Sequence, residues 1–407
     1  MTPQARGGYR QTPGFGSIGE VSTAVAPAVD IDPEFDTHFV TAPRPFHVAW
    51  CAETARRASA FAHITPNWFA SVMGTGIVAT AAVTLPVHMP GLRVFATLVW
   101  VLAATLLVTL TAAFATHWLR HRTEAVGYAN HPVMSQFYGA PAMALLTVGA
   151  GTLLLGRAVL GERIALLVGS VLWVAGTVLG LVVAVAVPYR MITRTGPAVT
   201  AVPAWMMPVV PPMVSASTGA LLLDHVGVAG ETLLMACYAM FGLSLLVGFV
   251  TVTMVYSRLM HGGLPEVQAI PTVWIVLGVI GQSITATNLL AAHASSVVTD
   301  TSVVSALHAF GIVYGVVMGG FGAFVFCVAA ALTVHAARRG LSFTLTWWSF
   351  TFPVGTCVTG ASALGAATGA VVFSGLAVLL YVALLVAWVT VAMHTVRGVA
   401  SGRLLAG

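Results

Sequence analysis

The stretch TWWSFTFPVGTCVTG, residues 346–360, is apolar enough to cross a membrane, but Pro353 interrupts it and four aromatic residues crowd in front of that proline. In hydrocarbon every backbone N–H and C=O must be bonded within the protein, so a break that faces lipid is costly. Breaks are tolerated where the backbone is buried in protein or borders a water-filled cavity. The stretch therefore predicts a broken helix in the interior of a membrane protein, with its largest side chains gathered at the break.

The composition of the whole chain agrees with a membrane location. Of its 407 residues, 58% are hydrophobic and only 7% are charged, whereas a soluble domain carries about 25% charged residues. The net charge of +5 is spread over short loops, which argues against nucleic-acid binding. The four cysteines stand singly, so neither a metal site nor a disulfide framework is predicted. We expect an all-α, multi-pass membrane protein without a cofactor.

Ten apolar runs are each long enough, at about 20 residues, to cross a bilayer. The polar residues 1–60 contain no run that could form a signal-peptide core, and they predict a disordered cytoplasmic tail. Residues 61–397 are then a ten-helix transmembrane domain, and residues 398–407 a short cytoplasmic tail. The ten runs cover residues 66–86, 92–116, 132–155, 163–188, 203–223, 231–256, 271–292, 304–334, 346–367 and 371–396.

The basic residues, all arginine, predict the orientation of these runs. With both termini in the cytoplasm, only Arg93, Arg157 and Arg163 fall on the outer side, and the other 14 of the 17 fall on the inner side. This asymmetry follows the positive-inside rule. We therefore expect a cell-membrane protein, plasma or inner membrane, with both termini in the cytoplasm.

The helix-breaking residues form a weak repeat. Pro66, Pro132, Pro203 and Pro271 start alternate runs at intervals of about 70 residues, which predicts five helical hairpins. Because broken helices belong away from lipid, we expect the five proline-bearing helices to surround a central pore in quasi-five-fold order, inside a ring of smoother helices. Alternatively, proline and glycine serve only close helix packing, but a proline in all five alternate runs favours the pore. The helix-break candidates within the runs are Pro141, Pro208, Pro211 and Pro353.

Four motifs carry a resemblance that covers residues 63–397. NWFASVMGTGIV (67–78), HPVMSQFYGAPAM (131–143), PAWMMPVVPPMVSASTG (203–219) and WWSFTFPVG (347–355) resemble the tellurite-resistance and dicarboxylate transporter family, which includes malate permeases, sulfite efflux pumps and plant slow anion channels. The resemblance implies ten helices in five hairpins around a pore, and it suggests a homotrimer. It also implies that a phenylalanine of the ninth helix closes the pore. The matching residue is Phe352, and Phe350 is the competing assignment.

The pore predicted in this way suits a small anion. No Asp, Glu or Arg falls inside a run away from its ends, which argues against a cation path. Arginines at the mouths and the positive ends of broken helices attract anions. No catalytic motif is present, so we do not expect an enzyme. The uncharged pore-lining candidates are Phe69, Thr75, Gln136, Phe137, Ser215, Gln282, Thr351 and Thr356.

The expected function is transport of sulfite or of a C4-dicarboxylate such as malate through a pore gated by an aromatic residue. A dicarboxylate would profit from a fixed arginine in the pore, and none is present, which favours sulfite. The alternative is a proton-coupled C4-dicarboxylate carrier. The expected partners are the anion and membrane lipid.

Overall fold

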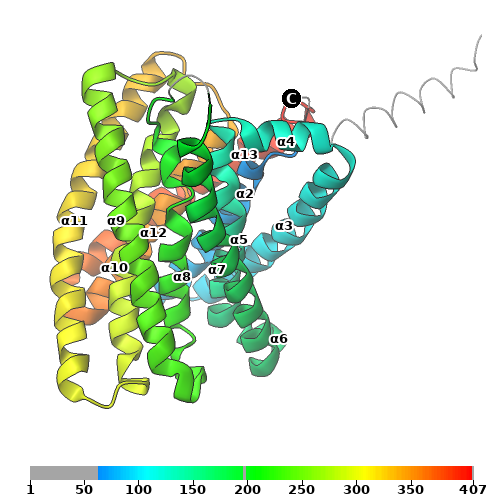
Figure 1. Ribbon diagram of the computed structural model, residues 1–407. Helices are drawn as coiled ribbons and strands as arrows, with labels where there is room; N and C mark the ends of the chain where they lie inside the picture. Colours follow the sequence, from blue (N-terminus) through cyan, green and yellow to red (C-terminus); the bar gives the residue numbers. More distant parts are fainter. Residues whose placement is uncertain (1–62, 196–198, 406–407) are drawn as a thin grey trace, which may run out of the picture. The chain divides into compact units, whose positions relative to one another are not determined.

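The computed structural model describes residues 63–195 and 199–405, and within these ranges the chain is helical, without a β-strand (Figure 1). The tail predicted for residues 1–60 lies outside the described residues. The described residues all belong to one compact unit. At the other end, the last helix continues to Ala400, beyond the expected boundary at residue 397.

Five inner segments share one construction, in which a short 3₁₀ helix leads into an α-helix. The α-helices pack in a closed order, α2 on α5, α5 on α8, α8 on α10, α10 on α12, and α12 on α2. Their bounds are η1 (Pro66–Trp68) with α2 (Phe69–Thr84), η2 (Met134–Tyr138) with α5 (Gly139–Leu155), η3 (Pro203–Met206) with α8 (Val210–Ala220), η6 (Val267–Trp274) with α10 (Ile275–His293), and η8 (Leu345–Phe350) with α12 (Phe352–Thr368).

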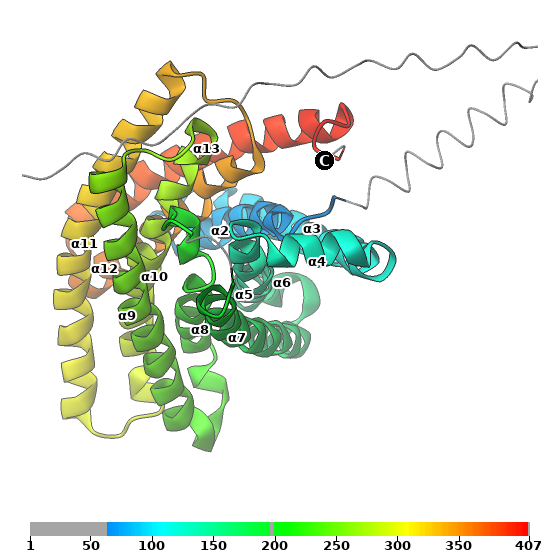
Figure 2. The same ribbon diagram turned by 45° about the horizontal axis from the view of Figure 1, so that its top comes forward.

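Five long helices cover this ring, each following one inner segment along the chain. Each packs on its own inner helix and on the next one around the ring, for example α3 on α2 and α5, and α13 on α12 and α2. Figures 1 and 2 show two of them, α9 and α11, side by side along one flank. The five are α3 (Leu92–Arg120), α7 (Glu162–Ile192), α9 (Gly230–Gly262), α11 (Thr301–Arg338) and α13 (Val371–Ala400).

Short helices occupy the connections. One of them, α4 (Arg122–Asn130), does not follow from the ten apolar runs, because its sequence is too polar to indicate a span. The others are α6 (Arg157–Leu160), η4 (Leu223–His225), η5 (Gly227–Ala229) and η7 (Ala294–Ser296).

Three tryptophan side chains of the outer helices form equivalent hydrogen bonds to the inner ring. Trp100 of α3 donates from Nε1 to Thr152 Oγ1 of α5 at 3.3 Å. Trp173 of α7 donates to the backbone carbonyl of Ser215 of α8 at 2.9 Å. In the same way Trp388 of α13 donates to Thr75 Oγ1 of α2 at 3.1 Å. Each bond links an outer helix to the next inner helix around the ring, which satisfies the indole N–H without water.

Eight of the described helices are long and apolar enough to cross a membrane, so the chain is a multi-pass membrane protein. The expected runs 66–86 and 203–223 contain the two exceptions, α2 with 16 residues and α8 with 11 residues. At 1.5 Å per residue these α-helices are only ~24 and ~17 Å long, shorter than a hydrocarbon core of ~30 Å. Two other inner segments reach a spanning length only together with their 3₁₀ helices, in Met134–Leu155 and Leu345–Thr368. The sequence thus predicts ten runs, whereas eight helices of the described residues are both long and apolar enough.

The prolines lie at the entrances of the inner helices and not in their middles. Pro66 and Pro203 start 3₁₀ helices, and Pro353 is the second residue of α12. Pro141 is the third residue of α5, and Pro211 is the second residue of α8. A proline in the first turn lacks only an N–H that has no partner within the helix. Pro208 falls between η3 and α8, so all the predicted breaks are junctions at the start of a helix.

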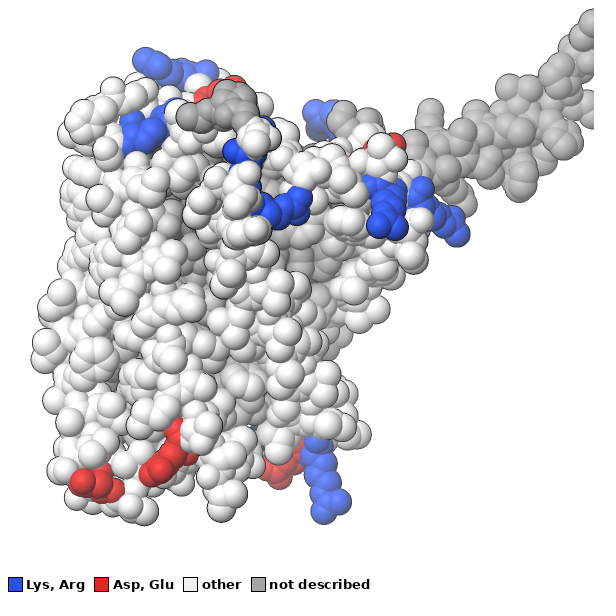
Figure 3. All heavy atoms as spheres, viewed as in Figure 1, with Lys and Arg blue, Asp and Glu red and all other residues white. Residues whose placement is uncertain are grey.

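The outer helices present apolar side chains to the surroundings, and their charges gather at their ends. Figure 3 shows a broad uncharged band between two charged ends. The end at which the outer helices finish is called the arginine-rich end here, since Arg120, Arg190, Arg338 and Arg397 lie in the last turns of α3, α7, α11 and α13. Each outer helix exposes large apolar residues in the band, including Leu98, Val171, Leu246, Val316 and Leu379.

Candidate functional site

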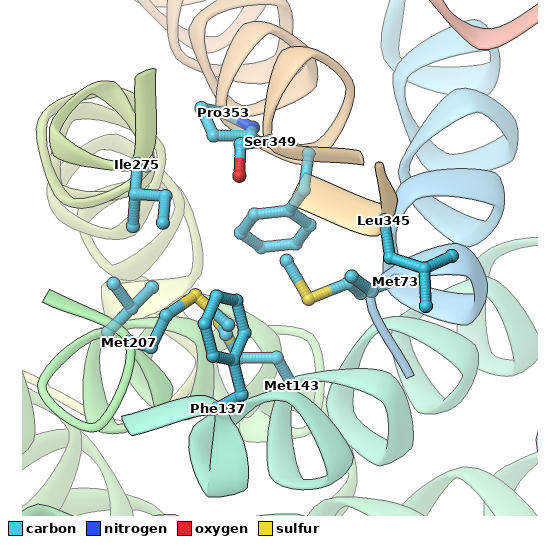
Figure 4. A pocket seen from close by; sticks show the side chains of 12 residues that line it. Met73, Phe137, Met143, Met207, Ile275, Leu345, Ser349 and Pro353 are labelled. Carbon is cyan, nitrogen blue, oxygen red and sulfur yellow. The ribbon is translucent and has the colours of Figure 1, made fainter. Parts of the chain in front are cut away.

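A small cavity lies where the five inner segments meet, and every one of them contributes to its wall (Figure 4). Its volume is ≈ 10 Å³, which is about the least space that can hold one water molecule. The ring is therefore closed at this level. The wall consists of Ala70 and Met73, Phe137 and Met143, Met207 and Val210, Ile275 and Gly278, and Leu345, Ser349, Phe352 and Pro353.

Phe352 is the most completely enclosed aromatic residue of this wall, with 2% of its surface exposed. It is the first residue of α12, directly after the junction residue Thr351. Thr351 ends η8, since both its backbone N–H and its hydroxyl donate to the carbonyl of Trp348. Pro353 then fits the first turn of α12. The sequence TFP thus fixes where the new helix starts and so places the Phe352 side chain in the cavity.

Phe350, the competing gate assignment, lies elsewhere. Its ring packs edge-on against Trp274 at 5.7 Å and against Trp347 at 5.8 Å, measured between ring centroids. It does not line the cavity. Two residues apart in sequence, the two phenylalanines therefore occupy different environments.

Among the other pore-lining candidates, Phe137 lines the cavity, and three lie on the side of the inner segments that faces the outer helices. Phe69 packs on Phe114 of α3 with ring centroids 5.6 Å apart. Thr75 accepts the hydrogen bond from Trp388 of α13 described above. Gln136 donates from Nε2 to the carbonyl of Pro132 at 3.1 Å and contacts Met191 of α7.

The remaining polar candidates lie between neighbouring inner helices. Thr356 donates to the carbonyl of Pro353 at 2.6 Å and reaches Leu277 of α10. Gln282 of α10 donates from Nε2 to Ser217 of α8. The hydroxyl of Ser215 and the Oε1 atom of Gln282 are buried without a hydrogen-bond partner among the described residues. These groups form a polar band between α8, α10 and α12.

Two features of the site were missed from sequence. Thr285 of α10 and Thr359 of α12 extend the polar band, with 2.8 Å between their hydroxyl oxygens. The methionines of the wall, Met73, Met143 and Met207, were also not predicted. A signal existed, because each lies within about one turn of a junction between a 3₁₀ helix and an α-helix, but methionine is common in any apolar core.

The site carries no formal charge. None of the cavity-lining residues is charged, and the α-helices of the inner ring contain no Asp, Glu or Arg among their described residues. In the described part of the chain, no group of His, Cys, Asp or Glu could hold a metal ion. The arrangement can therefore restrict passage and offer dipoles and hydroxyls to a solute.

Comparisons with known proteins agree with this architecture. The family model SLAC1, described as a voltage-dependent anion channel, matches residues 63–396. A sulfite efflux pump of Arthroderma otae is 26% identical over 84% of this chain and 94% of its own length. A sulfite efflux pump of Trichophyton rubrum is 25% identical over 86% of this chain and 96% of its own. An uncharacterized transporter of Methanocaldococcus jannaschii is 25% identical over 83% and 95%.

The family predicted from the four sequence motifs is thereby confirmed, and its members named here are channels and transporters. The chain belongs to the SLAC1 family of anion channels and transporters, the tellurite-resistance and dicarboxylate transporter family.

Proposed function

We propose that this chain transports small inorganic anions of the sulfite class along the axis of the five-helix ring, and that Phe352 closes the path. The observation that carries the proposal is the closed, uncharged constriction to which all five inner segments contribute. The printed names of the fungal relatives support sulfite as the anion.

In this proposal the chain crosses the membrane ten times, as five hairpins, and the path runs along the axis of the inner ring. The segments η1–α2 and η3–α8 complete the ring although their α-helices are short. Nearly every residue of α2 and α8 is buried, so neither helix needs the apolar length of a lipid-facing span. The arginine-rich end faces the cytoplasm of the cell membrane, in accord with the positive-inside rule.

The direction of the inner helices supports an anion as the solute. The α-helices begin close to the cavity, since Val210, Ile275 and Phe352 are first residues of α8, α10 and α12 and also line its wall. A helix N-terminus acts as roughly +0.5 elementary charge. No carboxylate lines the wall to offset this field. Anions entering from the arginine-rich end are attracted to the cavity, whereas cations are repelled.

The wall around Phe352 supports a gate that opens by side-chain movement. Met73, Met143 and Met207 line the same cavity, and Figure 4 shows their side chains beside that of Phe137. Methionine has three rotatable bonds and repacks at low cost. The aromatic ring can therefore move without moving the helices that surround it.

The test is anion flux into liposomes that contain the purified chain. Phe352→Ala removes the ring from the cavity and is expected to raise sulfite flux at least tenfold, which corresponds to lowering the barrier by about 1.4 kcal/mol. Phe350→Ala is the matched control, because it removes the same side chain two residues away and leaves the cavity intact. Sulfite flux in this control should stay within a factor of two of the native chain.

Malate and a pH gradient supply the outcomes that contradict the proposal. Malate flux driven by a pH gradient, with little sulfite flux, would identify a proton-coupled dicarboxylate carrier. Equal effects of Phe352→Ala and Phe350→Ala on sulfite flux would show that Phe352 is not the gate. Neither result is expected from an uncharged constriction whose inner helices carry no carboxylate within the described residues.

A further inference from the structure

A second, larger hollow lies outside the ring, between the outer helices α7 and α9 and against the 3₁₀ segments η2 and η3. Its volume is ≈ 1010 Å³, at the upper end of the ~300–1,000 Å³ range of sites for small organic ligands. It shares no lining residue with the central cavity. We refer to it as the α7–α9 groove.

The deep part of the groove is apolar. Val183 and Val187 of α7 form one wall, and Val247, Val250 and Met254 of α9 form the other. These residues belong to helices that cross the uncharged band. An acyl chain fits such walls, but it gains little over its contacts with other lipids, because hydrocarbon is as apolar as valine. Selection of an occupant must therefore come from the polar end of the groove.

The polar end carries two arginines. Arg190 lies in the last turn of α7, and Arg194 follows shortly after the helix ends. The Nη2 atom of Arg190 donates to Asn130 Oδ1 of α4, which holds this guanidinium at the rim. Among the described residues that line the groove there is no Asp or Glu. The two positive charges are thus not neutralised by a neighbouring carboxylate of the lining.

Guanidinium groups bind phosphate oxygens in pairs of hydrogen bonds. The aromatic residues Trp118, Tyr138 and Trp205 also line the groove, and Trp and Tyr gather at the level of lipid headgroups. Basic pockets between membrane helices on the cytoplasmic side bind anionic headgroups. Apolar walls, an aromatic rim and two arginines together match one molecule that has an acyl chain and a phosphate.

We propose that the α7–α9 groove binds an anionic phospholipid, with its phosphate at Arg190 and Arg194 and an acyl chain between α7 and α9. The occupant lies against the reverse side of two segments that line the central cavity. Gln136 faces the groove and Phe137 the cavity, and Pro208 faces the groove where Met207 faces the cavity. A lipid in the groove therefore supports two of the five elements of the constriction.

The binding test uses the full chain in detergent and phosphatidylglycerol as the probe, read out by native mass spectrometry and by the melting temperature. Phosphatidylglycerol is expected to bind as one retained molecule and to raise the melting temperature more than phosphatidylcholine with identical acyl chains. The double variant Arg190→Gln with Arg194→Gln should bind it roughly thirtyfold more weakly, since each arginine contributes about 1 kcal/mol near an anionic headgroup and about 1.4 kcal/mol corresponds to a factor of ten in affinity.

The matched control is Arg338→Gln with Arg339→Gln, which removes two arginines at the same end of the protein but outside the groove. This control should bind phosphatidylglycerol as the native chain does. A second variant, Val250→Trp, fills the apolar part without removing a charge and should also weaken binding. Val250 is 62% exposed, so the larger ring does not strain the core.

Three outcomes would overturn the proposal. Equal stabilisation by phosphatidylcholine would show that the arginines select no headgroup. Equal stabilisation by glycerol phosphate would show a site for soluble phosphate without a lipid. An equal loss of phosphatidylglycerol binding in the two double arginine variants would show that the effect does not arise from the groove. None of these readouts depends on which anion the ring transports.

Discussion

Helices α10 and α11 follow one another in the chain and pack together, yet they differ in burial and in side-chain composition. In the most apolar part of each, 94% of the α10 residues are buried, against 28% in α11. Helix α10 carries Gln282, Ser283 and Asn288 within its buried length, whereas the middle of α11 exposes valines and phenylalanines. The comparison teaches that contact with lipid selects for apolar side chains, while a place in the ring selects for small and polar ones.

The glycines of α10 and α11 differ in their surroundings in the same way. A Cβ atom on Gly281 of α10 would lie 2.5 Å from the backbone nitrogen of Cys357 in α12, closer than real Cβ contacts come. On α11, Gly311, Gly315 and Gly322 face α10, but Gly319 has nothing within 4 Å of its added Cβ. The glycines of α11 therefore serve close packing on only one side of that helix.

The lipid-facing side of α11 provides the first test of this comparison. A charged side chain placed there should have the largest effect, on membrane insertion. Val316 lies near the middle of α11 and is 50% exposed. Val316→Arg is expected to cost about 2.5–3.5 kcal/mol of membrane insertion. The same change at Val303, near the start of α11, should cost little, because an arginine there reaches the interface. The yield of membrane-inserted protein measures both, and equal yields would contradict a lipid-facing α11.

The tight packing of α10 in the inner ring provides the second test, which adds one methyl group. Gly281→Ala forces α10 and α12 apart and should cost about 1–3 kcal/mol, the usual range for an overpacked core. Gly319→Ala on α11 adds the same methyl group into open space, and it should leave the melting temperature unchanged or slightly higher. Thermal unfolding in detergent distinguishes the two. The packing argument fails if both variants melt at the same temperature.

The bond between the two helices should have a smaller effect. Asn288 of α10 donates from Nδ2 to the carbonyl of Gly311 of α11 at 3.2 Å and to its own helix at 2.9 Å. Asn288→Ala is expected to cost about 0.6 kcal/mol, the average for hydrogen bonds between membrane helices, and at most about 1.7 kcal/mol. Ser305→Ala, which removes an exposed hydroxyl bonded only within α11, is the control and should melt like the native chain.

The smallest effect is expected at the end of the ring opposite the arginine-rich end. Asp224 of η4 accepts a hydrogen bond from His293 Nδ1 of α10 at 2.8 Å. Burial acts to raise the pKa of Asp224, but hydrogen bonds from Ser296 and His293 outweigh it, and the pKa is lower than usual. The carboxylate therefore adds stability above its unfolded pKa of about 3.9, and this is lost as pH falls through the folded value.

Asp224→Asn should accordingly lower the melting temperature slightly at pH 7 and remove part of the loss seen below about pH 4. The carboxylate is 44% exposed, so the contribution stays under about 1 kcal/mol. Glu231→Gln removes another carboxylate near that end, in the first turn of α9, and serves as the control. A melting temperature that is insensitive to Asp224→Asn at both pH values would show that the pair adds nothing.

The sequence predicted the helical fold and the family, but not the direction of each side chain. Phe352 could be named as a candidate because the resemblance to the family implies a phenylalanine of the ninth helix at the pore, and WWSFTFPVG places that residue directly before Pro353. Thr75 and Gln136 could not be placed, because an inner helix touches protein on every side and shows no amphipathic stripe. The groove between α7 and α9 was equally hidden, since it joins arginines and valines from helices about 60 residues apart.

The position of the prolines also affects the timescale on which the constriction can open. A helix that bends in its middle moves as a body, over microseconds to milliseconds, whereas side chains change rotamer far faster. With the breaks at the entrances and intact helices beyond them, the gate proposed at Phe352 would open by movement of its ring and of the neighbouring thioethers. Electrical recordings of single molecules should then show rapid flicker between conducting and closed levels in place of long, well-separated dwells.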